Sequence, residues 1–200
     1  MTIGVPKIPL NPPGAKETIW VEIDEVLYRG RLLLLFGEID SDMVIDFVSL
    51  LLLLGVDDDD IFLFINSPGG DIQSGITIYD TMKTLIPDVC TLVIGLAASV
   101  ASLLLSGGTY NKRLGFPHAR VMIQQPVTDS FSASAEIMAS EAEKMFRLRS
   151  TIADIYAKNT GKPVSVIQQD LERDKYMSVT EAQEYGIIDK VTKETKKWYF

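Results

Sequence analysis

The sequence predicts a single α/β domain in which strands and helices alternate. Two observations support this prediction. At 200 residues and 46% hydrophobic content, the chain can bury one substantial core but is too short for two ordinary domains. Short apolar runs also alternate with longer segments whose apolar residues recur at helical spacing, a pattern typical of strands followed by helices.

The alternation begins near Arg31 and predicts five elements in a row. Apolar runs that predict strands and periodic segments that predict helices follow one another in the order 32–36, 40–54, 61–65, 71–85 and 91–94. Asp40 or Ser41 can cap the first of the helices, and Gly55 can end it. The acidic residues 57–60 that follow are typical of a solvated turn.

The second half of the chain predicts a short helix, a short strand and a long helix. The short helix runs from Ser99 to about residue 105, a strand covers 120–125, and Pro126 ends that strand. Residues 133–159 contain neither proline nor glycine and carry apolar residues at helical spacing. At about 1.5 Å per residue this helix would reach roughly 35–40 Å, more than a small domain needs for its own core. We therefore expect it to project toward another subunit.

The N-terminal segment 1–17 is rich in proline. Pro6, Pro9, Pro12 and Pro13 remove backbone donors and restrict their neighbours, so we expect an irregular, mobile arm that carries no core. The segment has no apolar run of signal-peptide length and no arginine-rich amphipathic pattern. No cleavable targeting segment is expected from it.

Composition excludes several classes of function. The formal net charge is -8 and the pI about 4.7, without a Lys/Arg stripe, so no nucleic-acid partner is expected. The apolar stretches fall short of the roughly 20 residues that a membrane-spanning helix requires, so no membrane partner is expected. The single cysteine, Cys90, lies in an apolar run and predicts a buried free thiol instead of a disulfide scaffold.

Two glycine-marked turns carry the candidate chemistry. Residues 65–70 read INSPGG and residues 95–99 read GLAAS, and each turn precedes a predicted helix. A serine at a strand-to-helix turn lies where helix-terminal amides point outward, so the Ser99 hydroxyl could attack a carbonyl whose developing oxyanion those amides bind. Gly70 could bring a second amide close. From spacing alone, an ordinary helix cap at Ser99 and a tight turn at Gly69 and Gly70 are the favoured explanation of these residues.

Six stretches of the chain resemble one protease family. In chain order they read INSPGG (65–70), IYDTM (78–82), GLAAS (95–99), PHARVMI (117–123), QP (125–126) and ERDKYMSVTEAQEYGIID (172–189). Together they resemble the proteolytic subunit of the ATP-dependent Clp protease. The opening MTIGVPKIP is further similar to the start of the plastid-encoded subunit and its cyanobacterial relatives.

The resemblance implies a fold, an assembly and a cellular setting. It implies one domain over 1–200, a spiral of strand-strand-helix units shared with crotonases, from which a handle region at about 125–160 projects. Subunits of the family form heptameric rings that stack as a tetradecamer and degrade unfolded polypeptides in the enclosed chamber. An AAA+ unfoldase uses the ATP, and no cofactor or metal is implied for this chain. The plastid-type similarity implies the chloroplast stroma, or otherwise a bacterial or cyanobacterial cytoplasm.

The resemblance also assigns the catalytic positions, with one departure. It places the nucleophile at Ser99, the triad acid at Asp174, and the oxyanion-hole donors at the amides of Gly70 and Val100. The base histidine, which the family carries in Met-Ile-His-Gln-Pro, is here Gln124. A side-chain amide has no useful basicity near neutral pH, so it cannot take the serine proton. Loss of a triad histidine can cost on the order of 10^6 in turnover, about 8 kcal/mol of barrier.

His118 is the only histidine in the chain. It precedes Gln124 by six residues, roughly 20 Å along a strand at about 3.3 Å per residue. Pro117 beside it indicates the beginning of a strand. We therefore expect a surface or turn histidine that does not replace the missing base.

The same resemblance implies positions that bind partners. Phe62 and Phe64 stand where the family shows aromatic residues in the apolar pocket for unfoldase loops, although aromatics that alternate in a strand also pack against neighbours. Thr84 stands where a further aromatic is expected, which weakens that docking. Arg173, beside the triad acid, is implied in the contact between the two rings.

Three functions remain open on the sequence alone. The first is a catalytically impaired, partly structural subunit in a Clp protease ring where other chains supply active sites. The second is an active serine endopeptidase in which a neighbour, a water network or Asp174 partly replaces the histidine. The third is a crotonase-fold protein that binds acyl-CoA through paired backbone amides.

Overall fold

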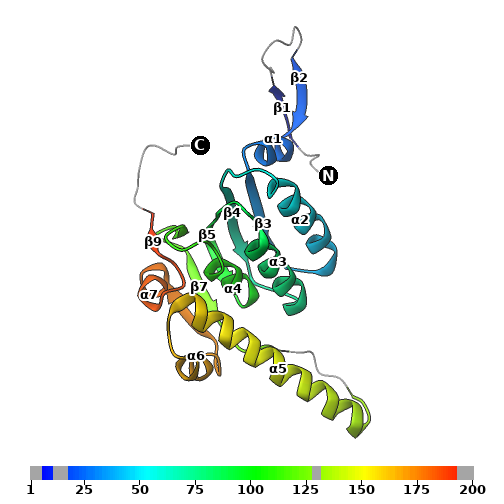
Figure 1. Cartoon of the computed structure of the whole chain (residues 1–200), viewed down its shortest axis with the longest axis vertical. Helices are drawn as coiled ribbons and strands as arrows, with labels where there is room; N and C mark the ends of the chain where they lie inside the picture. Colours follow the sequence, from blue (N-terminus) through cyan, green and yellow to red (C-terminus); the bar gives the residue numbers. More distant parts are fainter. Residues whose placement is uncertain (1–5, 11–17, 128–131, 193–200) are drawn as a thin grey trace.

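The structure of the chain is a computed structural model that describes residues 6–10, 18–127 and 132–192. A two-stranded hairpin and a long helix extend from opposite ends of a central body in which helices pack on a sheet (Figure 1). In chain order the elements are β1 (Lys7–Leu10), β2 (Ile19–Glu22), α1 (Ile23–Arg29), β3 (Leu32–Phe36), α2 (Ser41–Leu54), β4 (Ile61–Ser67), α3 (Ile72–Thr84), β5 (Val89–Ala98), α4 (Val100–Ser106), β6 (Arg113–Gly115), β7 (Arg120–Ile123), α5 (Ala135–Thr160), α6 (Val164–Asp170), β8 (Lys175–Ser178), α7 (Val179–Tyr185) and β9 (Lys190–Val191).

The sheet is built on three parallel strands and branches at the third. β3, β4 and β5 lie side by side, and α2 and α3 supply the crossover connections that parallel pairing requires. The first half of β5 then pairs with β6 and its second half with β7, both in parallel. β9 extends the sheet beyond β6, and β8 pairs antiparallel with β7. This arrangement confirms the predicted α/β fold.

Gly95 marks the branch point of β5. Its φ is 75°, a left-handed value that favours glycine, and a Cβ at this position would stand 2.9 Å from Asn66 Oδ1. The same oxygen accepts a hydrogen bond from the amide of Leu96 at 3.2 Å. The Asn66 side chain therefore joins the end of β4 to the bend in β5, and the second half of β5 continues alongside β7.

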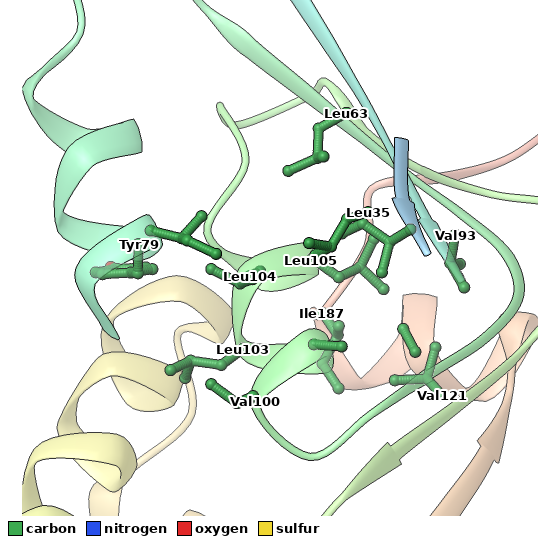
Figure 2. Packing of buried hydrophobic residues seen from close by; sticks show 14 of the residues in the cluster. Leu35, Leu63, Tyr79, Val93, Val100, Leu103, Leu104, Leu105, Val121 and Ile187 are labelled. Carbon is green, nitrogen blue, oxygen red and sulfur yellow. The ribbon is translucent and has the colours of Figure 1, made fainter. Parts of the chain in front are cut away.

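The core lies between one face of the sheet and the helices that cover it. Along β4, Leu63 and Ile65 have no exposed surface, whereas Phe62 and Phe64 alternate with them and are half-buried. α4 is buried over its whole length and packs with these strands (Figure 2). Burying one such aliphatic side chain stabilises the fold by about 1.5–3 kcal/mol.

The other face of β3 and β4 carries apolar side chains that the described residues do not fully cover. Leu34 is 42% exposed and Phe36 is 50% exposed. Leu34 pairs in register with Phe64, so the two strands present one continuous apolar surface. Apolar side chains gathered on one face are typical of a surface that contacts another protein.

The long helix α5 projects from the body, as the sequence predicted (Figure 1). It covers Ala135–Thr160 and is buried only toward its C-terminal end, at Ile152, Ala153 and Tyr156. Large apolar side chains on the projecting part are more than half exposed: Ile137, Met138 and Phe146. One end of α5 therefore belongs to the core of this chain, and the rest extends beyond it.

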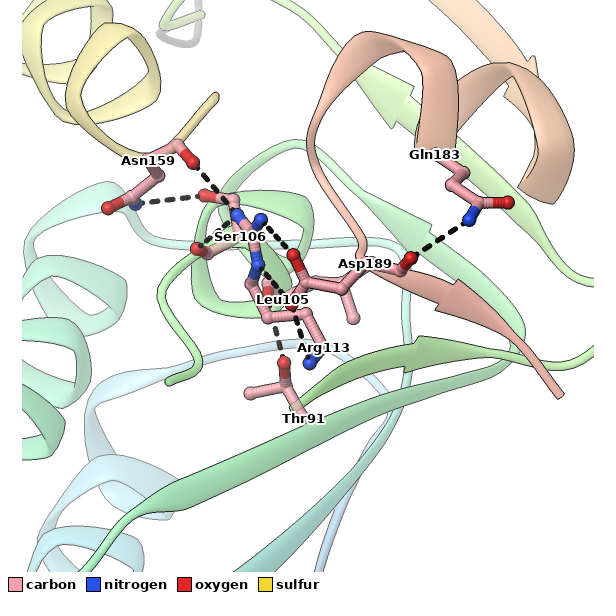
Figure 3. A network of polar contacts seen from close by, with 7 residues as sticks. All are labelled: Thr91, Leu105, Ser106, Arg113, Asn159, Gln183 and Asp189. Carbon is pink, nitrogen blue, oxygen red and sulfur yellow. Dashed lines mark hydrogen bonds and ion pairs between the residues drawn. The ribbon is translucent and has the colours of Figure 1, made fainter. Parts of the chain in front are cut away.

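A buried ion pair holds the end of α5 against the sheet (Figure 3). The Arg113 guanidinium on β6 contacts the Asp189 carboxylate at 2.6 Å, and these side chains are 4% and 8% exposed. The guanidinium also donates to the carbonyl of Asn159 on α5 at 2.9 Å. The Asn159 side chain in turn donates to Ser106 Oγ on α4 at 3.1 Å. One polar network thus joins α4, α5, β6 and the residue before β9.

The ion pair lowers the pKa of Asp189. Burial alone would raise this pKa, but the hydrogen bonds and charge of Arg113 outweigh burial and hold the pKa below its usual value. The stabilisation is therefore present above the unfolded-state pKa of about 3.9 and is lost as the pH falls through the lower folded-state pKa.

Acid is therefore expected to destabilise the protein partly through this carboxylate. Below about pH 5 the free energy of unfolding should fall less steeply in Asp189→Asn than in the unchanged protein, because asparagine has no proton to gain. Urea denaturation at several pH values measures the slopes. Asp154→Asn, at an exposed position on α5, is the control. An unchanged slope in Asp189→Asn would contradict the prediction.

The N-terminal segment is more regular than its prolines suggested. Lys7–Leu10 forms β1, which pairs antiparallel with β2, so these residues are a strand and not an irregular arm. Pro9 is tolerated because both strands of a two-stranded ribbon are edge strands. None of the residues of β1 is fully buried. Residues 1–5 and 11–17 of the predicted arm lie outside the described residues.

No helix among the described residues is both long enough and apolar enough to cross a membrane. α5 carries ion pairs along its projecting part, such as Lys144 with Glu141 and Arg147 with Glu143.

Candidate active site

Four segments meet at the carboxyl ends of β3, β4, β5 and β7 and form a cleft. Because these strands are parallel, their carboxyl ends lie at the same edge of the sheet, where sites of α/β proteins form. The cleft has a volume of about 340 Å³. Its lining includes Glu38, Gly70, Ile72, Ser99, Gln124 and Val127. The structure thus brings together Ser99, Gln124 and Gly70, three positions marked by the sequence.

Ser99 occupies a strained turn between β5 and α4. Its φ of 53° and ψ of -127° correspond to the first central position of a type II′ turn, which glycine normally fills. A non-glycine residue held there carries on the order of 1–3 kcal/mol of strain. The Ser99 amide donates to the carbonyl of Met122 at 3.0 Å, so the turn is tied to β7. This conformation places a half-buried serine at the cleft, at the start of a helix.

Glycine at position 99 is expected to stabilise the protein relative to alanine. Ser99→Gly and Ser99→Ala both remove the hydroxyl, but only glycine relieves the positive φ, and the greater freedom of glycine in the unfolded chain offsets part of that gain. We expect the free energy of unfolding of Ser99→Gly to be about 1 kcal/mol larger, by urea denaturation. Equal stabilities would show that the turn stores no strain.

Gly70 lines the cleft with Ser99, and Val100 directly follows Ser99 in the chain. Gly70 forms an isolated bridge with Ile39 in which Ile39 and Asp71 donate the hydrogen bonds, so the bridge does not consume the Gly70 amide. The amide of Val100 is the first of α4, and first-turn amides have no acceptor within their own helix. Amides in such positions can stabilise the oxyanion that forms when serine attacks a carbonyl.

Gly69 lets the β4 turn approach the serine closely. A Cβ at Gly69 would stand 2.8 Å from Ser99 Cβ and 3.4 Å from Ser99 Oγ, and the φ of Gly69 is 99°. A side chain at position 69 would therefore collide with the serine turn. Asp71 then caps α3 by accepting a hydrogen bond from the amide of Ser74 at 2.8 Å, which fixes the turn at its other end.

Gln124 directly follows β7 and is half-buried. The β7–β8 ladder ends with Ile123 opposite Lys175, so the next pair outward is Gln124 and Asp174. The positions that the resemblance assigns to the base and the acid are therefore neighbours across two antiparallel strands.

Asp174 does not line the Ser99 cleft. It is exposed and borders a separate surface hollow that also includes Asp170 and Arg173. Within the described part of the chain, no hydrogen bond joins Asp174 to Gln124 or to Ser99. The structure thus brings Ser99, Gly70 and Gln124 to one cleft, and Asp174 lies outside it.

His118 lies in an exposed turn before β7. Gln124 lies just after the same strand, so the histidine stands at the opposite end of β7 from the cleft. This location agrees with the expected turn histidine.

The positions assigned to partner binding are surface positions. Phe62 and Phe64 lie on the partly exposed face of the sheet, while Thr84 is exposed at the last residue of α3. Arg173 is exposed in the segment before β8. Nearby, Glu172 forms an ion pair with Arg149 of α5 at 3.7 Å, which links this segment to the long helix.

Glu38 is a residue of the cleft that sequence reasoning missed. It follows β3 in the loop that leads to α2, and it is exposed. Its position after a parallel strand is the signal that would have found it, because the carboxyl ends of adjacent parallel strands share an edge. The cleft therefore carries one carboxylate beside Ser99 and Gln124.

The described residues form neither a metal-binding cluster nor a reactive thiol site. These residues contain no group of three or more His, Cys, Asp or Glu side chains that could hold a metal ion. Cys90 is a buried free thiol, and burial, with a smaller contribution from Asp60, raises its pKa to about 11. A thiol that is protonated at neutral pH is a poor nucleophile.

Comparison with known proteins places the chain in a family. Residues 15–195 match the family model described as Clp protease. The chain is 50% identical over 193 residues to the chloroplastic ATP-dependent Clp protease proteolytic subunit 1 of Arabidopsis thaliana, covering 96% of this chain and 98% of the relative. It is 48% identical to the ATP-dependent Clp protease proteolytic subunits of Phalaenopsis aphrodite subsp. formosana, over 198 residues (98% and 97% covered), and Coffea arabica, over 196 residues (97% and 100% covered). With this match over nearly its whole length, the chain belongs to the Clp protease family.

Proposed function

We propose that this chain is a proteolytic-core subunit of a Clp serine endopeptidase and that its own catalytic site is impaired. One observation carries the proposal. Ser99 and Gln124 line the same cleft, so the position from which a base would act on the nucleophile holds an amide side chain. The conclusion rests on the chemistry of the side chain at that position.

The missing step is proton transfer. Attack by the Ser99 oxygen on a peptide carbonyl requires an acceptor for the hydroxyl proton, and the leaving amine later requires a donor. Gln124 can accept a hydrogen bond from the hydroxyl but cannot hold the proton. The amides of Gly70 and Val100 would still bind an oxyanion, so peptide binding and a small residual rate remain.

The surface of the chain supports assembly with other subunits. The projecting part of α5 exposes large apolar side chains, and the face of β3 and β4 exposes Leu34 and Phe36 beside Phe62 and Phe64. In the proposed complex, α5 and Arg173 contribute to contact between two stacked heptameric rings, and the strand aromatics contribute to docking of an AAA+ unfoldase. Active subunits in the same ring would cleave unfolded polypeptides.

The relatives indicate the setting of this complex. One is named a chloroplastic ATP-dependent Clp protease subunit. We place the present chain in the plastid, with the stroma as the compartment and a bacterial or cyanobacterial cytoplasm as the alternative. In this assembly the unfoldase consumes the ATP, and the chain itself binds no cofactor.

Peptide hydrolysis by the purified chain tests the proposal. Rings that contain only this chain, verified by native mass spectrometry, should cleave a fluorogenic peptide no faster than rings of Ser99→Ala. Mixed rings with a triad-bearing subunit should cleave at the rate of the active subunits. A clear Ser99-dependent rate in the pure rings would overturn the claim of impairment.

The active-enzyme alternative makes a distinct prediction. If a neighbour or Asp174 replaces the histidine, a fluorophosphonate should label Ser99 at a rate comparable with a triad-bearing subunit. Absence of labelling over hours would exclude it. Acyl-CoA binding, the third function considered, has no support from the three relatives described above.

A further inference from the structure

Two buried hydroxyl groups lie directly behind the Ser99 turn. Ser102 Oγ is 2.7 Å from the carbonyl oxygen of Ser99 and 2.8 Å from that of Met122. The hydroxyl of Tyr156 is 2.7 Å from Ser102 Oγ and 3.3 Å from the Ser99 carbonyl oxygen. Ser102 is 0% exposed and Tyr156 is 1% exposed, so these contacts are shielded from water.

The two residues reach this point from different elements. Ser102 is one turn along α4 from Ser99, so its side chain can reach back to the carbonyl three residues earlier. Tyr156 belongs to the short buried stretch near the end of α5. Burial raises the pKa of Tyr156 well above its ordinary value, and the phenol therefore remains a neutral hydrogen-bond donor. A small hollow lined by Ser99, Gln124 and Tyr156 shows that α5 reaches the candidate active site here.

The hydroxyls hold one particular peptide group. The Ser99 carbonyl and the Val100 amide belong to the same planar trans peptide unit, so they point in opposite directions. The hydroxyls of Ser102 and Tyr156 hold the Ser99 carbonyl oxygen on their side of the peptide unit. The Val100 amide therefore points away from these two side chains. Val100 is the residue whose amide serves as an oxyanion donor in the proposed function.

We propose that Tyr156 and Ser102 are positioning residues that hold the Ser99–Val100 peptide unit and thereby orient both the nucleophile and the oxyanion donor. Strained residues such as Ser99 persist only where their surroundings fix them. The amides of Ser102 and Leu103 donate to the Ser99 carbonyl at 3.0 and 3.3 Å, and the two hydroxyls add side-chain contacts to these backbone bonds. Each hydroxyl has one proton, so the two protons are shared among the Ser99 carbonyl, the Met122 carbonyl and the contact between the hydroxyls. The catalytic effect of this pair rests on the proposed function of the cleft. Its structural effect does not.

Hydrogen exchange in the assembled protein tests the structural effect. Tyr156→Phe removes one oxygen and keeps the ring. The matched control is Tyr79→Phe, since Tyr79 is also buried and its hydroxyl contacts Asn159 of α5 at 3.3 Å, away from Ser99. We expect the amides of residues 99–103 to exchange about tenfold faster in Tyr156→Phe, equivalent to about 1.4 kcal/mol, and to be unchanged in Tyr79→Phe.

Binding of a peptide boronic acid tests the catalytic effect without requiring a base for turnover. The Ser99 oxygen forms a bond to boron, its proton passes to solvent, and the tetrahedral boronate occupies the oxyanion position. We expect at least about tenfold weaker binding in Tyr156→Phe and unchanged binding in Tyr79→Phe. Ser102→Ala should weaken binding similarly, and the double variant should lose less than the sum, because both hydroxyls act on one peptide unit.

The outcomes separate this inference from the proposed function. Equal exchange rates at residues 99–103 in Tyr156→Phe and Tyr79→Phe would overturn the inference, whether or not boronate binding changes. Faster exchange confined to Tyr156→Phe supports it. If the unchanged protein binds no boronate, the proposed peptide-receiving cleft fails, while the exchange comparison still decides the role of Tyr156. If Tyr156→Phe does not assemble, Ser102→Ala decides: local exchange must rise at 99–103, and normal exchange there overturns the inference.

Discussion

Replacing Gln124 with histidine is expected to raise peptide turnover by at least about 10^3-fold. The histidine would stand at the carboxyl end of β7, in the cleft that Ser99 lines. Its imidazole could take the Ser99 proton during attack and return a proton to the leaving amine. Loss of the base lowers turnover in serine proteases by a factor on the order of 10^6, and this factor sets the upper limit of the recovery.

Asp174 is expected to determine how much peptide turnover Gln124→His recovers. It is exposed and does not contact Gln124 in the described structure, so the new imidazole would have a neighbouring carboxylate but no fixed hydrogen bond to it. Adding Asp174→Asn to Gln124→His should abolish most of the gain if this carboxylate aligns the ring. Initial rates with a fluorogenic peptide measure both effects, with Ser99→Ala in the histidine background as the blank. No gain in Gln124→His would show that the site is defective beyond position 124.

Replacing Arg113 with methionine is expected to destabilise the fold by about 3–5 kcal/mol. The substitution leaves the buried carboxylate of Asp189 without its cation and removes the hydrogen bond to the Asn159 carbonyl at 2.9 Å. For a domain of this size, the loss corresponds to a fall in Tm of roughly 6–20 °C. Thermal unfolding should be followed at one fixed protein concentration, because assembly also contributes to Tm.

Lys112 provides a matched control for the ion pair. It precedes Arg113 in the chain and pairs with Asp60 and Asp88 at 2.6 and 2.8 Å, but its side chain is 35% exposed. Lys112→Met should therefore cost no more than about 1 kcal/mol. The double change Arg113→Met with Asp189→Leu should recover part of the loss, since it leaves no buried charge. Similar small losses in the two single variants would contradict the structural role of the buried pair.

Much of the fold could be predicted because local signals determine it. Asp40 caps α2 and accepts a hydrogen bond from the amide of Met43, and Gly55 ends that helix, as the sequence indicated. The alternation of β4 and the length of α5 were visible for the same reason, since periodicity alone reveals a half-buried strand or a long helix. Short strands such as β6 and β9 have too few residues to show a period, and they were missed.

Only the site residues that lie in an unusual local sequence could be predicted. The small residues around Ser99 and Gly70 mark tight turns, and the structure places both turns at one cleft. The separate hollow that Asp174 borders depends on how the segment between α6 and β8 folds, which no local pattern specifies. The role of Tyr156 was equally hidden, because an aromatic on a helix usually indicates core packing, and its contact with Ser99 joins residues 57 positions apart.

In the proposed assembly, the projecting part of α5 would make helical content depend on association of the subunits. A helix that packs against nothing gains only local stabilisation, and ion pairs such as Glu143 with Arg147 contribute a few tenths of a kcal/mol each. Its far end should therefore fray when subunits are diluted and become ordered when they associate. Circular dichroism at 222 nm would then vary with protein concentration, and subunit exchange could be followed from the backbone signal without any label.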